Sequence, residues 1–197
     1  MQSMDDGRVS SAADSIAGWP AELLPGHRTL IEYWDALRGT RTYPSRSDVD
    51  PTAIRQLLPY TLLLDADPDE GKARFRLAGE AVNTFYGFNV RGMTWAEVRA
   101  RVQAEGGTFT TSLVNLQYRR VAQGGVGAYR QGVSIRAGAS YLHYARILLP
   151  LSGDDTRVDA MIGVSYSNQE KRNVAEALTN IDFLFSSDTF ALVDPAS

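Results

Sequence analysis

Residues 72–92, KARFRLAGEAVNTFYGFNVRG, decide how the rest of the sequence is interpreted. Residues 73–77 alternate between apolar and arginine side chains, which is the period of a strand with one buried face. After Gly79, apolar side chains recur at helical spacing over residues 82–86. The stretch therefore predicts a strand that passes through a glycine into a short helix lying over the sheet.

Toward the N-terminus, residues 60–65, YTLLLD, predict a second strand. The acidic turn at residues 67–71 joins the two strands into a hairpin. Asp50 and Pro51 are a typical helix start, with the aspartate as N-cap and the proline in the first turn, and Pro59 ends that expected helix.

Residues 27–38 predict an amphipathic helix. Leu30, Trp34 and Leu37 lie at positions i, i+4 and i+7, with Ile31 beside them. This apolar face has two candidate partners, the domain's own sheet and the same helix of a second subunit, and the sequence leaves both open.

Beyond residue 92 the pattern changes from helical to extended. Residues 95–102 predict a short helix and residues 108–122 a longer one. Residues 129–135, 141–149 and 158–166 then read as strands of an antiparallel meander, joined by glycine-containing turns.

The order of the expected elements is two strands, helices, then three strands. This order predicts an α+β fold with a five-stranded antiparallel sheet, helices packed on one face, and an N-terminal amphipathic helix. The absence of βαβ alternation argues against a doubly wound nucleotide-binding fold. We expect a flexible N-terminal tail over residues 1–24, one domain with its helical lead over 25–168, and a C-terminal helix or tail over 169–197.

The C-terminal part carries a short apolar repeat. Val174, Leu178, Ile181 and Phe185 are spaced by four, three and four residues, as in a coiled-coil seam. One such stretch is too short to be stable alone, so it would dock on the sheet or pair across a dimer. Residues 194–197 are expected to be loose.

Composition limits the classes of function. The net charge is −3 at pH 7, and all but two of the 20 basic residues are arginines, so neither a broad nucleic-acid surface nor a polybasic membrane patch is expected. The sequence has no cysteine, which removes disulfides and thiolate chemistry. No apolar run is long enough to span a bilayer, and the polar, acidic N-terminus is unlike a secretory signal. These observations predict a soluble cytoplasmic protein.

The ordered succession of short motifs over residues 25–168 resembles the PAS domain superfamily. More specifically, it resembles the small bacterial proteins that hold one PAS domain after a helical N-terminal lead. The motifs that carry the resemblance are Tyr33-Trp34 with Arg38, Pro44-Ser45-Arg46, Asp48-Val49-Asp50-Pro51, Leu57-Leu58-Pro59, Leu64-Asp65, Phe75-Arg76-Leu77-Ala78-Gly79 and Tyr86-Gly87. The resemblance implies a sensory or regulatory domain without enzymatic activity, with undefined ligand and partners.

This sequence lacks the residues that usually bind the two common chromophores of PAS domains. A haem-binding PAS domain takes an axial ligand from the helical segment, and residues 79–124 contain no histidine. A flavin photosensor forms an adduct with a cysteine, and the sequence contains none. The identity of any cofactor therefore stays unknown, and no metal site is expected.

PAS sheets bind small molecules between the inner face of the sheet and the helices. On that basis the candidate pocket residues are Phe85, Tyr86, Trp95, Leu113, Leu116, Tyr129, His143 and Ile162. Arg76 or Arg146 would bind an anion if directed inward. The alternative is that these aromatic and apolar side chains fill the core with no ligand.

Three hypotheses follow for the function. The first is a non-enzymatic PAS regulator that acts through protein contacts and a small ligand, forms a homodimer through its N-terminal helix, and needs an unknown signalling partner. The second is an enzyme or carrier on a cone-shaped α+β sheet, in which His143 and a nearby acid act on a small apolar substrate. The third, a structural adaptor, differs from the first in having a filled core.

Overall fold

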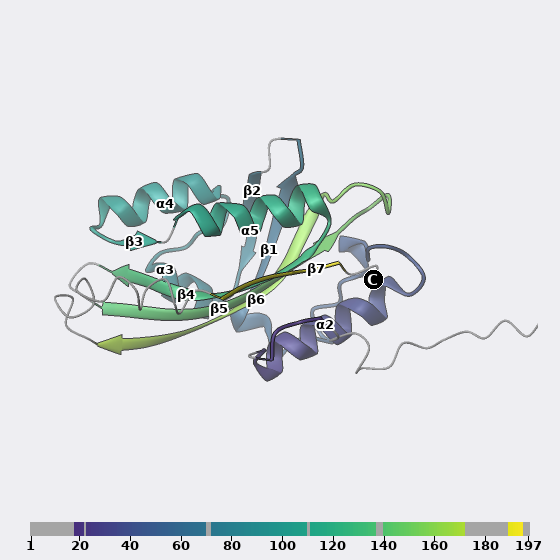
Figure 1. Ribbon diagram of the computed structural model, residues 1–197, viewed down its shortest axis with the longest axis horizontal. Coiled ribbons are helices and arrows are strands. Elements are labelled where there is room, and N and C mark those ends of the chain that lie inside the picture. The colour runs from purple at the N-terminus through teal and green to yellow at the C-terminus, as the bar shows by residue number, and fades with distance from the viewer. Residues whose placement is uncertain are drawn as a thin grey trace, which may run out of the picture.

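The computed structural model describes residues 18–21, 23–69, 72–109, 111–136, 140–171 and 189–194. Helices and strands follow one another in the α+β order that the PAS resemblance implies (Figure 1). The elements are α2 (Pro25–Arg38), η1 (Arg46–Asp48), η2 (Leu58–Tyr60), β1 (Thr61–Asp67), β2 (Lys72–Ala78), α3 (Glu80–Tyr86), α4 (Trp95–Ala104), β3 (Thr108–Phe109), α5 (Thr111–Gly124), β4 (Gly127–Arg136), β5 (Ser140–Leu151), β6 (Ala160–Lys171) and β7 (Thr189–Val193).

The strands form one antiparallel sheet in the order β2-β1-β6-β5-β4-β3, and β7 also pairs with β4. The described residues therefore make a seven-stranded sheet where five strands were expected. The two additional strands are the short β3 and β7, which both lie along the outer edge of β4. The long strands β5 and β6 lie at the centre and pair over their full length.

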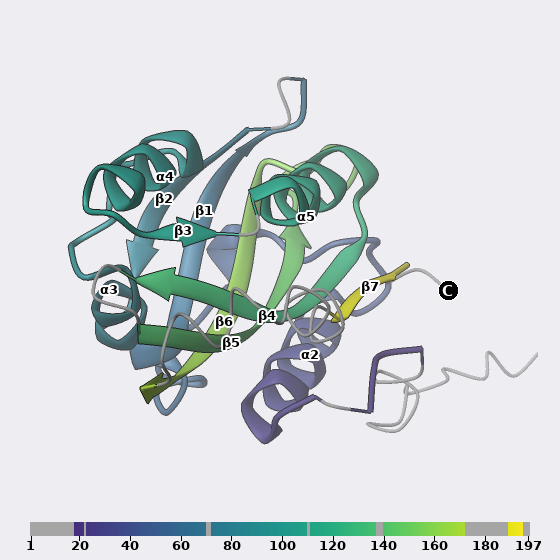
Figure 2. The ribbon, with the colours of Figure 1, turned by 60° about the vertical axis from the view of Figure 1, so that its left-hand side comes forward.

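Both faces of the sheet are covered. In Figures 1 and 2 the helices α4 and α5 lie over one face and α2 lies against the other. Because successive side chains of a strand point to opposite faces, β5 divides its residues between the two layers. Leu148 belongs to the core beneath α3, α4 and α5, which we call the α3–α5 core, whereas Ile147 and Leu149 belong to the core beneath α2, the α2 core.

The helix α2 packs on the sheet of its own chain, which is one of the two placements that the sequence left open. His27, Leu30, Ile31 and Trp34 are its buried residues. The indole Nε1 of Trp34 donates a 2.6 Å hydrogen bond to the backbone oxygen of Pro150 in β5. Burial of this apolar stripe and one buried hydrogen bond hold α2 against the central strand.

The passage from β2 into α3 follows the prediction, and it depends on Gly79. The backbone N–H of Gly79 donates to the oxygen of Thr61, which brings the chain against η2. A Cβ at this position would overlap the backbone oxygens of Leu58 and Pro59. Only glycine fits this close approach, after which Glu80 starts the helix.

The helix expected from Asp50 to Pro59 is wrong. Residues 51–57 form successive turns instead, followed by η2. Their backbone hydrogen bonds span three residues, as from Leu57 N–H to the oxygen of Ile54 and from Tyr60 N–H to that of Leu57. Ile54 and Leu57, three residues apart, are both buried, which matches the three-residue repeat of these turns.

Both ends of the domain extend beyond the expected boundaries. Trp19 and Leu23, which were assigned to the N-terminal tail, pack in the α2 core, and Leu23 is buried. Residues 189–193, assigned to a C-terminal helix or tail, form β7. The repeat at Val174, Leu178, Ile181 and Phe185 lies outside the described residues.

The start of the long helix also differs from the expectation. Thr108 and Phe109 form β3, and α5 begins at Thr111. Among the described residues, no helix combines the length and the apolar character needed to cross a membrane.

Candidate functional site

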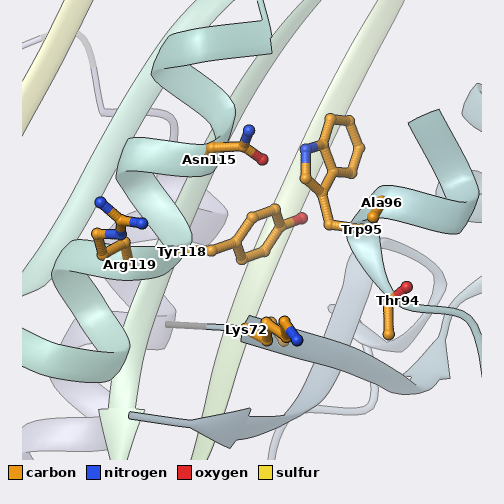
Figure 3. A pocket seen from close by; sticks show the side chains of 8 residues that line it. Lys72, Thr94, Trp95, Ala96, Asn115, Tyr118 and Arg119 are labelled. Carbon is orange, nitrogen blue, oxygen red and sulfur yellow. The ribbon is translucent and has the colours of Figure 1, made fainter. Parts of the chain in front are cut away.

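A pocket of about 370 Å³ lies where β2, α4 and α5 meet, over the face of the sheet that these helices cover (Figure 3). We call it the α4–α5 pocket. Its lining residues come from three elements and the residue before α4: Lys72, Ala73, Thr94, Trp95, Ala96, Asn115, Tyr118 and Arg119. The volume falls at the lower end of the range for pockets that hold small organic ligands.

Local sequence places Trp95 at this pocket. Thr94 is the N-cap of α4, and its hydroxyl accepts a hydrogen bond from the N–H of Glu97. The Glu97 carboxylate accepts in return from the N–H of Thr94 at 2.6 Å, which completes a capping box. The cap fixes the first turn of α4, so Trp95 follows at once and turns its indole toward α5.

Trp95 and Tyr118 form an aromatic wall. Their ring centroids lie 5.8 Å apart with planes tilted by 40°. Tyr86 packs against Trp95 from α3, at 6.4 Å. Figure 3 shows the Tyr118 side chain crossing from α5 toward Trp95, with Asn115 one turn earlier in α5. This wall presents ring surface to the pocket.

Behind the wall lies a buried polar network that joins α5 to β5. The Nη1 of Arg146 donates a 2.9 Å hydrogen bond to the hydroxyl of Tyr118. Its Nε and Nη2 both donate to Oε1 of Gln117, at 3.0 and 2.6 Å. The amide nitrogen of Gln117 in turn donates to the backbone oxygen of Ala128 in β4 at 3.0 Å. Gln117 and Tyr118 thus fix the Arg146 guanidinium between helix and sheet.

The network is electrostatically unusual, because Arg146 is only 3% exposed and its hydrogen-bond partners Gln117 and Tyr118 are neutral. Arg130 is fully buried and stands directly opposite Arg146 in the β4–β5 register. The ring of Tyr144 lies 5.5 Å from the Arg130 guanidinium and 5.9 Å from that of Arg146. Burial raises the pKa of the Tyr118 hydroxyl well above its ordinary value, although Arg146 acts in the opposite direction. Tyr118 therefore stays a neutral acceptor at physiological pH.

Of the predicted pocket residues, Trp95 is the one that lines the α4–α5 pocket in the described part of the chain. Phe85, Tyr86 and Trp95 lie in the α3–α5 core, as expected of residues covering the inner face. Arg146 is directed inward, which is the arrangement that the sequence required for an anion-binding role. Leu116 is half-buried on α5, and for Leu113 only the backbone is described.

Four other residues that were expected to line the same cavity lie elsewhere in the structure. Tyr129 and Ile162 belong to the α2 core on the opposite face, because strand alternation sends them there. His143 shares that face and lines a separate pocket of about 350 Å³ with Leu24 and Tyr129 among its walls. Arg76 points outward: its side chain is 55% exposed and forms an ion pair with Asp65 at 3.4 Å.

His27 lies at the base of α2 on this second face and is fully buried. Its Nδ1 accepts a hydrogen bond from the N–H of Leu24 at 3.3 Å. Its ring packs edge-on against Tyr129 and Tyr166, with centroids 5.7 and 5.2 Å away. Burial lowers the pKa of His27 to about 4, although backbone groups of Ala145 and Val164 favour the protonated ring. The ring is therefore neutral at physiological pH. Within the described ranges, no three His, Cys, Asp or Glu side chains are grouped to hold a metal ion.

Sequence reasoning missed Lys72, Asn115, Tyr118 and Arg119 as pocket residues. A signal was present in α5, because Val114, Gln117, Tyr118 and Val121 follow the i, i+3, i+4, i+7 pattern of a buried helix face. A glutamine inside such a face indicates a buried polar partner. The arginine that it binds, on the neighbouring face of β5, is 29 residues away in sequence, and no local pattern connects the two.

Known proteins that are similar to this chain include light-oxygen-voltage and PAS domains, at low sequence identity. No curated protein matches the chain. A solved light-oxygen-voltage domain, from work on a flavin analogue and the mechanism of such domains, is 16% identical, with a TM-score of 0.43 over 67% of this chain and 92% of that one. The PAS domain from Bordetella pertussis BvgS is 17% identical, with a TM-score of 0.40 over 68% and 95% of the two chains. A family model described as a PAS domain matches residues 24–166, which is most of the sequence, and the chain therefore belongs to the PAS domain family.

Proposed function

We propose that this PAS domain is a non-enzymatic sensory or regulatory module that binds a small molecule in the α4–α5 pocket and signals through protein contacts. The observation that carries the proposal is that Tyr118 contacts both the pocket and the sheet. Its ring lines the pocket, and its hydroxyl is bonded to Arg146, which is buried in the central strand β5. A ligand that touches Tyr118 thereby acts on the sheet through one hydrogen bond.

The strand β5 offers a route from the pocket to the opposite face. Arg146 faces the α3–α5 core, and its neighbour Ile147 faces the α2 core. Further along β5, the backbone oxygen of Pro150 holds Trp34 of α2. A shift of β5 on ligand binding would therefore reach α2, the helix that leads into the domain.

The output is proposed to be a change in protein contacts, made in the cytoplasm by a homodimer with a signalling partner. The apolar stripe of α2 is already buried on its own sheet, so a second copy would have to meet the outward side of α2 or the apolar surface beside it at Leu24, which is 39% exposed. Light scattering at micromolar concentration tests this part: a mass of twice 21.6 kDa is expected, and the monomer mass alone would contradict it.

The alternative hypothesis of an enzyme or carrier depends on His143. This side chain lies on the face opposite the α4–α5 pocket, and none of the residues that line its pocket in the described part of the chain is a carboxylate. Because side chains such as Phe75, Phe85 and Tyr144 fill the α3–α5 core, the proposed ligand would lie at the edge of the helical layer and not beneath the centre of the sheet.

A pocket-filling variant tests the ligand-binding proposal. Ala96 lines the pocket on an exposed side of α4, and Ala100, four residues later, is also exposed but does not line it. We expect Ala96→Phe to abolish ligand binding and Ala100→Phe to retain it, because the two variants add the same ring to the same helix.

The measurement is native mass spectrometry of each protein purified from its own host, together with thermal shift across a metabolite library. A small molecule that accompanies the wild type and Ala100→Phe, but not Ala96→Phe, supports the proposal. Binding that survives in Ala96→Phe, or a wild type that no metabolite stabilises, would sink it.

A further inference from the structure

We infer that the α4–α5 pocket takes a small organic anion in which a carboxylate is attached to a planar ring. The inference rests on the proposed function, since it names the chemical class of ligand for the same pocket. It is argued from charge, from the aromatic wall and from the size of the pocket.

The rim of the pocket is cationic. Lys72 from β2 and Arg119 from α5 both line it, and Figure 3 shows Arg119 beside Tyr118 on α5 and Lys72 below Tyr118 on β2. Among the described residues that line the pocket, none is a carboxylate. A lining that contains cationic side chains and no carboxylate favours an anion over a cation at this opening.

A buried charge adds to this potential from behind. Arg146 is 3% exposed, and its hydrogen bonds go to the neutral groups of Gln117 and Tyr118. A guanidinium surrounded by neutral partners keeps its full charge, and low-dielectric surroundings screen that charge weakly. Tyr118 both lines the pocket and bonds to this guanidinium, so the positive potential of Arg146 acts on the pocket from behind the aromatic wall.

The wall selects a planar ligand. The tilted rings of Trp95 and Tyr118, 5.8 Å apart, offer a surface on which a flat ring can pack. Asn115 adds an amide, which can donate to a carboxylate oxygen. The volume of about 370 Å³ suits one or two rings. The first turn of α4 contributes little, because Glu97 already occupies its N-terminus.

The test uses the full chain labelled with ¹⁵N at its three tryptophans, and follows the indole signal of Trp95 in a titration. The probes are benzoate and phenylacetate, the neutral amides of both, and acetate as an anion without a ring. We expect benzoate and phenylacetate each to bind at least about tenfold more tightly than the matching amide and than acetate. Their binding should weaken as the salt concentration is raised.

A matched pair of arginines separates the role of charge in the pocket from net charge. Arg119 lines the pocket, whereas Arg120 is its exposed neighbour on α5 and does not. We expect Arg119→Gln to weaken benzoate about tenfold and to leave benzamide unchanged, Arg119→Lys to recover most of the loss, and Arg120→Gln to stay within about twofold of the wild type.

Three outcomes would overturn the inference. Equal affinity for carboxylate and amide, or equal effects of Arg119→Gln and Arg120→Gln, removes the anionic class but leaves a ligand-binding pocket in place. Failure of every probe to shift the Trp95 signal removes the aryl carboxylates, and the pocket-filling comparison of Ala96→Phe with Ala100→Phe then decides the proposed function independently.

Discussion

The hydroxyl of Tyr118 in α5 accepts a 2.9 Å hydrogen bond from Nη1 of Arg146 in β5, and both side chains are buried. The same phenol ring forms a wall of the α4–α5 pocket. One residue therefore belongs both to the surface that would meet a ligand and to the network that holds the central strand. Its removal should be measurable even without a ligand.

Tyr118→Phe deletes the acceptor and leaves the buried guanidinium short of one partner. We expect a loss of about 2 kcal/mol in the free energy of unfolding, because hydrogen bonds to charged groups are worth more than neutral ones. For a domain of this size the expected fall in Tm is about 4–8 °C.

Tyr33→Phe is the matched control, since it deletes the same atom from an α2 tyrosine whose hydroxyl accepts from the N–H of Asp50 in an exposed setting. We expect it to cost under about 1 kcal/mol in urea unfolding. Equal losses in the two variants would show that the Arg146 contact has no special weight.

A second hydrogen bond tests the attachment of α2. Trp34→Phe removes the indole N–H that bonds to the oxygen of Pro150 and leaves that buried carbonyl without this donor. We expect about 2 kcal/mol of destabilisation, and faster amide hydrogen exchange in α2 than in β5.

The control for this helix is Trp19→Phe, which trims a half-buried indole in the same α2 core and leaves the bond between Trp34 and Pro150 in place. Its α2 amides should exchange at nearly the wild-type rate. If Trp34→Phe also leaves exchange in α2 unchanged, the bond to Pro150 does not anchor the helix.

The glycine after β2 gives a steric prediction. Gly79→Ala places a methyl group against the backbone oxygens of Leu58 and Pro59, which cannot rotate away. We expect a loss of about 3 kcal/mol or more in the free energy of unfolding, at the upper end of the cost of overpacking.

Gly92 is the control, because its φ is +82° and nothing lies within 4 Å of the position that a Cβ would take. Alanine there should cost about 1 kcal/mol from backbone strain alone. Chemical denaturation of both variants distinguishes the two causes, and a smaller loss at Gly79 would contradict the close approach.

Much of the fold follows from local periodicity. The alternation in β2 and the helical spacing in α3 were readable from residues 72–86, and β4, β5 and β6 each appear near their expected positions. These elements bury one face or both, so their apolar patterns are strong. β7 was missed because its five residues, TFALV, were assigned to the C-terminal helix or tail, and their pairing with β4, about 60 residues earlier in the sequence, has no local signal.

The site was less predictable than the fold. A period-two pattern shows that Tyr129 and Arg130 face opposite sides, but it does not say which side the helices α3, α4 and α5 will cover. Tyr129 was therefore assigned to the pocket side of β4. In the structure that side carries the buried Arg130, which lies against Tyr144. The buried arginines Arg130 and Arg146 mark the face of the sheet that α3, α4 and α5 cover, whereas the aromatic residues occur on both faces.

The buried imidazole of His27 makes stability depend on pH. Its pKa is about 4 in the folded protein, against an ordinary value of 6.5. Between these values the unfolded chain binds more protons than the folded chain, so the free energy of unfolding rises with pH. The contribution of His27 is complete above pH 6.5 and is lost as the pH falls toward 4.

Urea unfolding at pH 7.5 and 4.5 measures this effect against His27→Gln, which keeps a side-chain acceptor for the Leu24 N–H but does not titrate. From pH 7.5 to 4.5 the wild type should lose about 2.5 kcal/mol more than the variant, since one unit of pKa shift corresponds to about 1.4 kcal/mol. Carboxylates such as Asp154 titrate in both proteins and cancel in the difference. A difference near zero would mean that His27 is protonated or solvated in the folded state, and that the base of α2 opens below neutral pH.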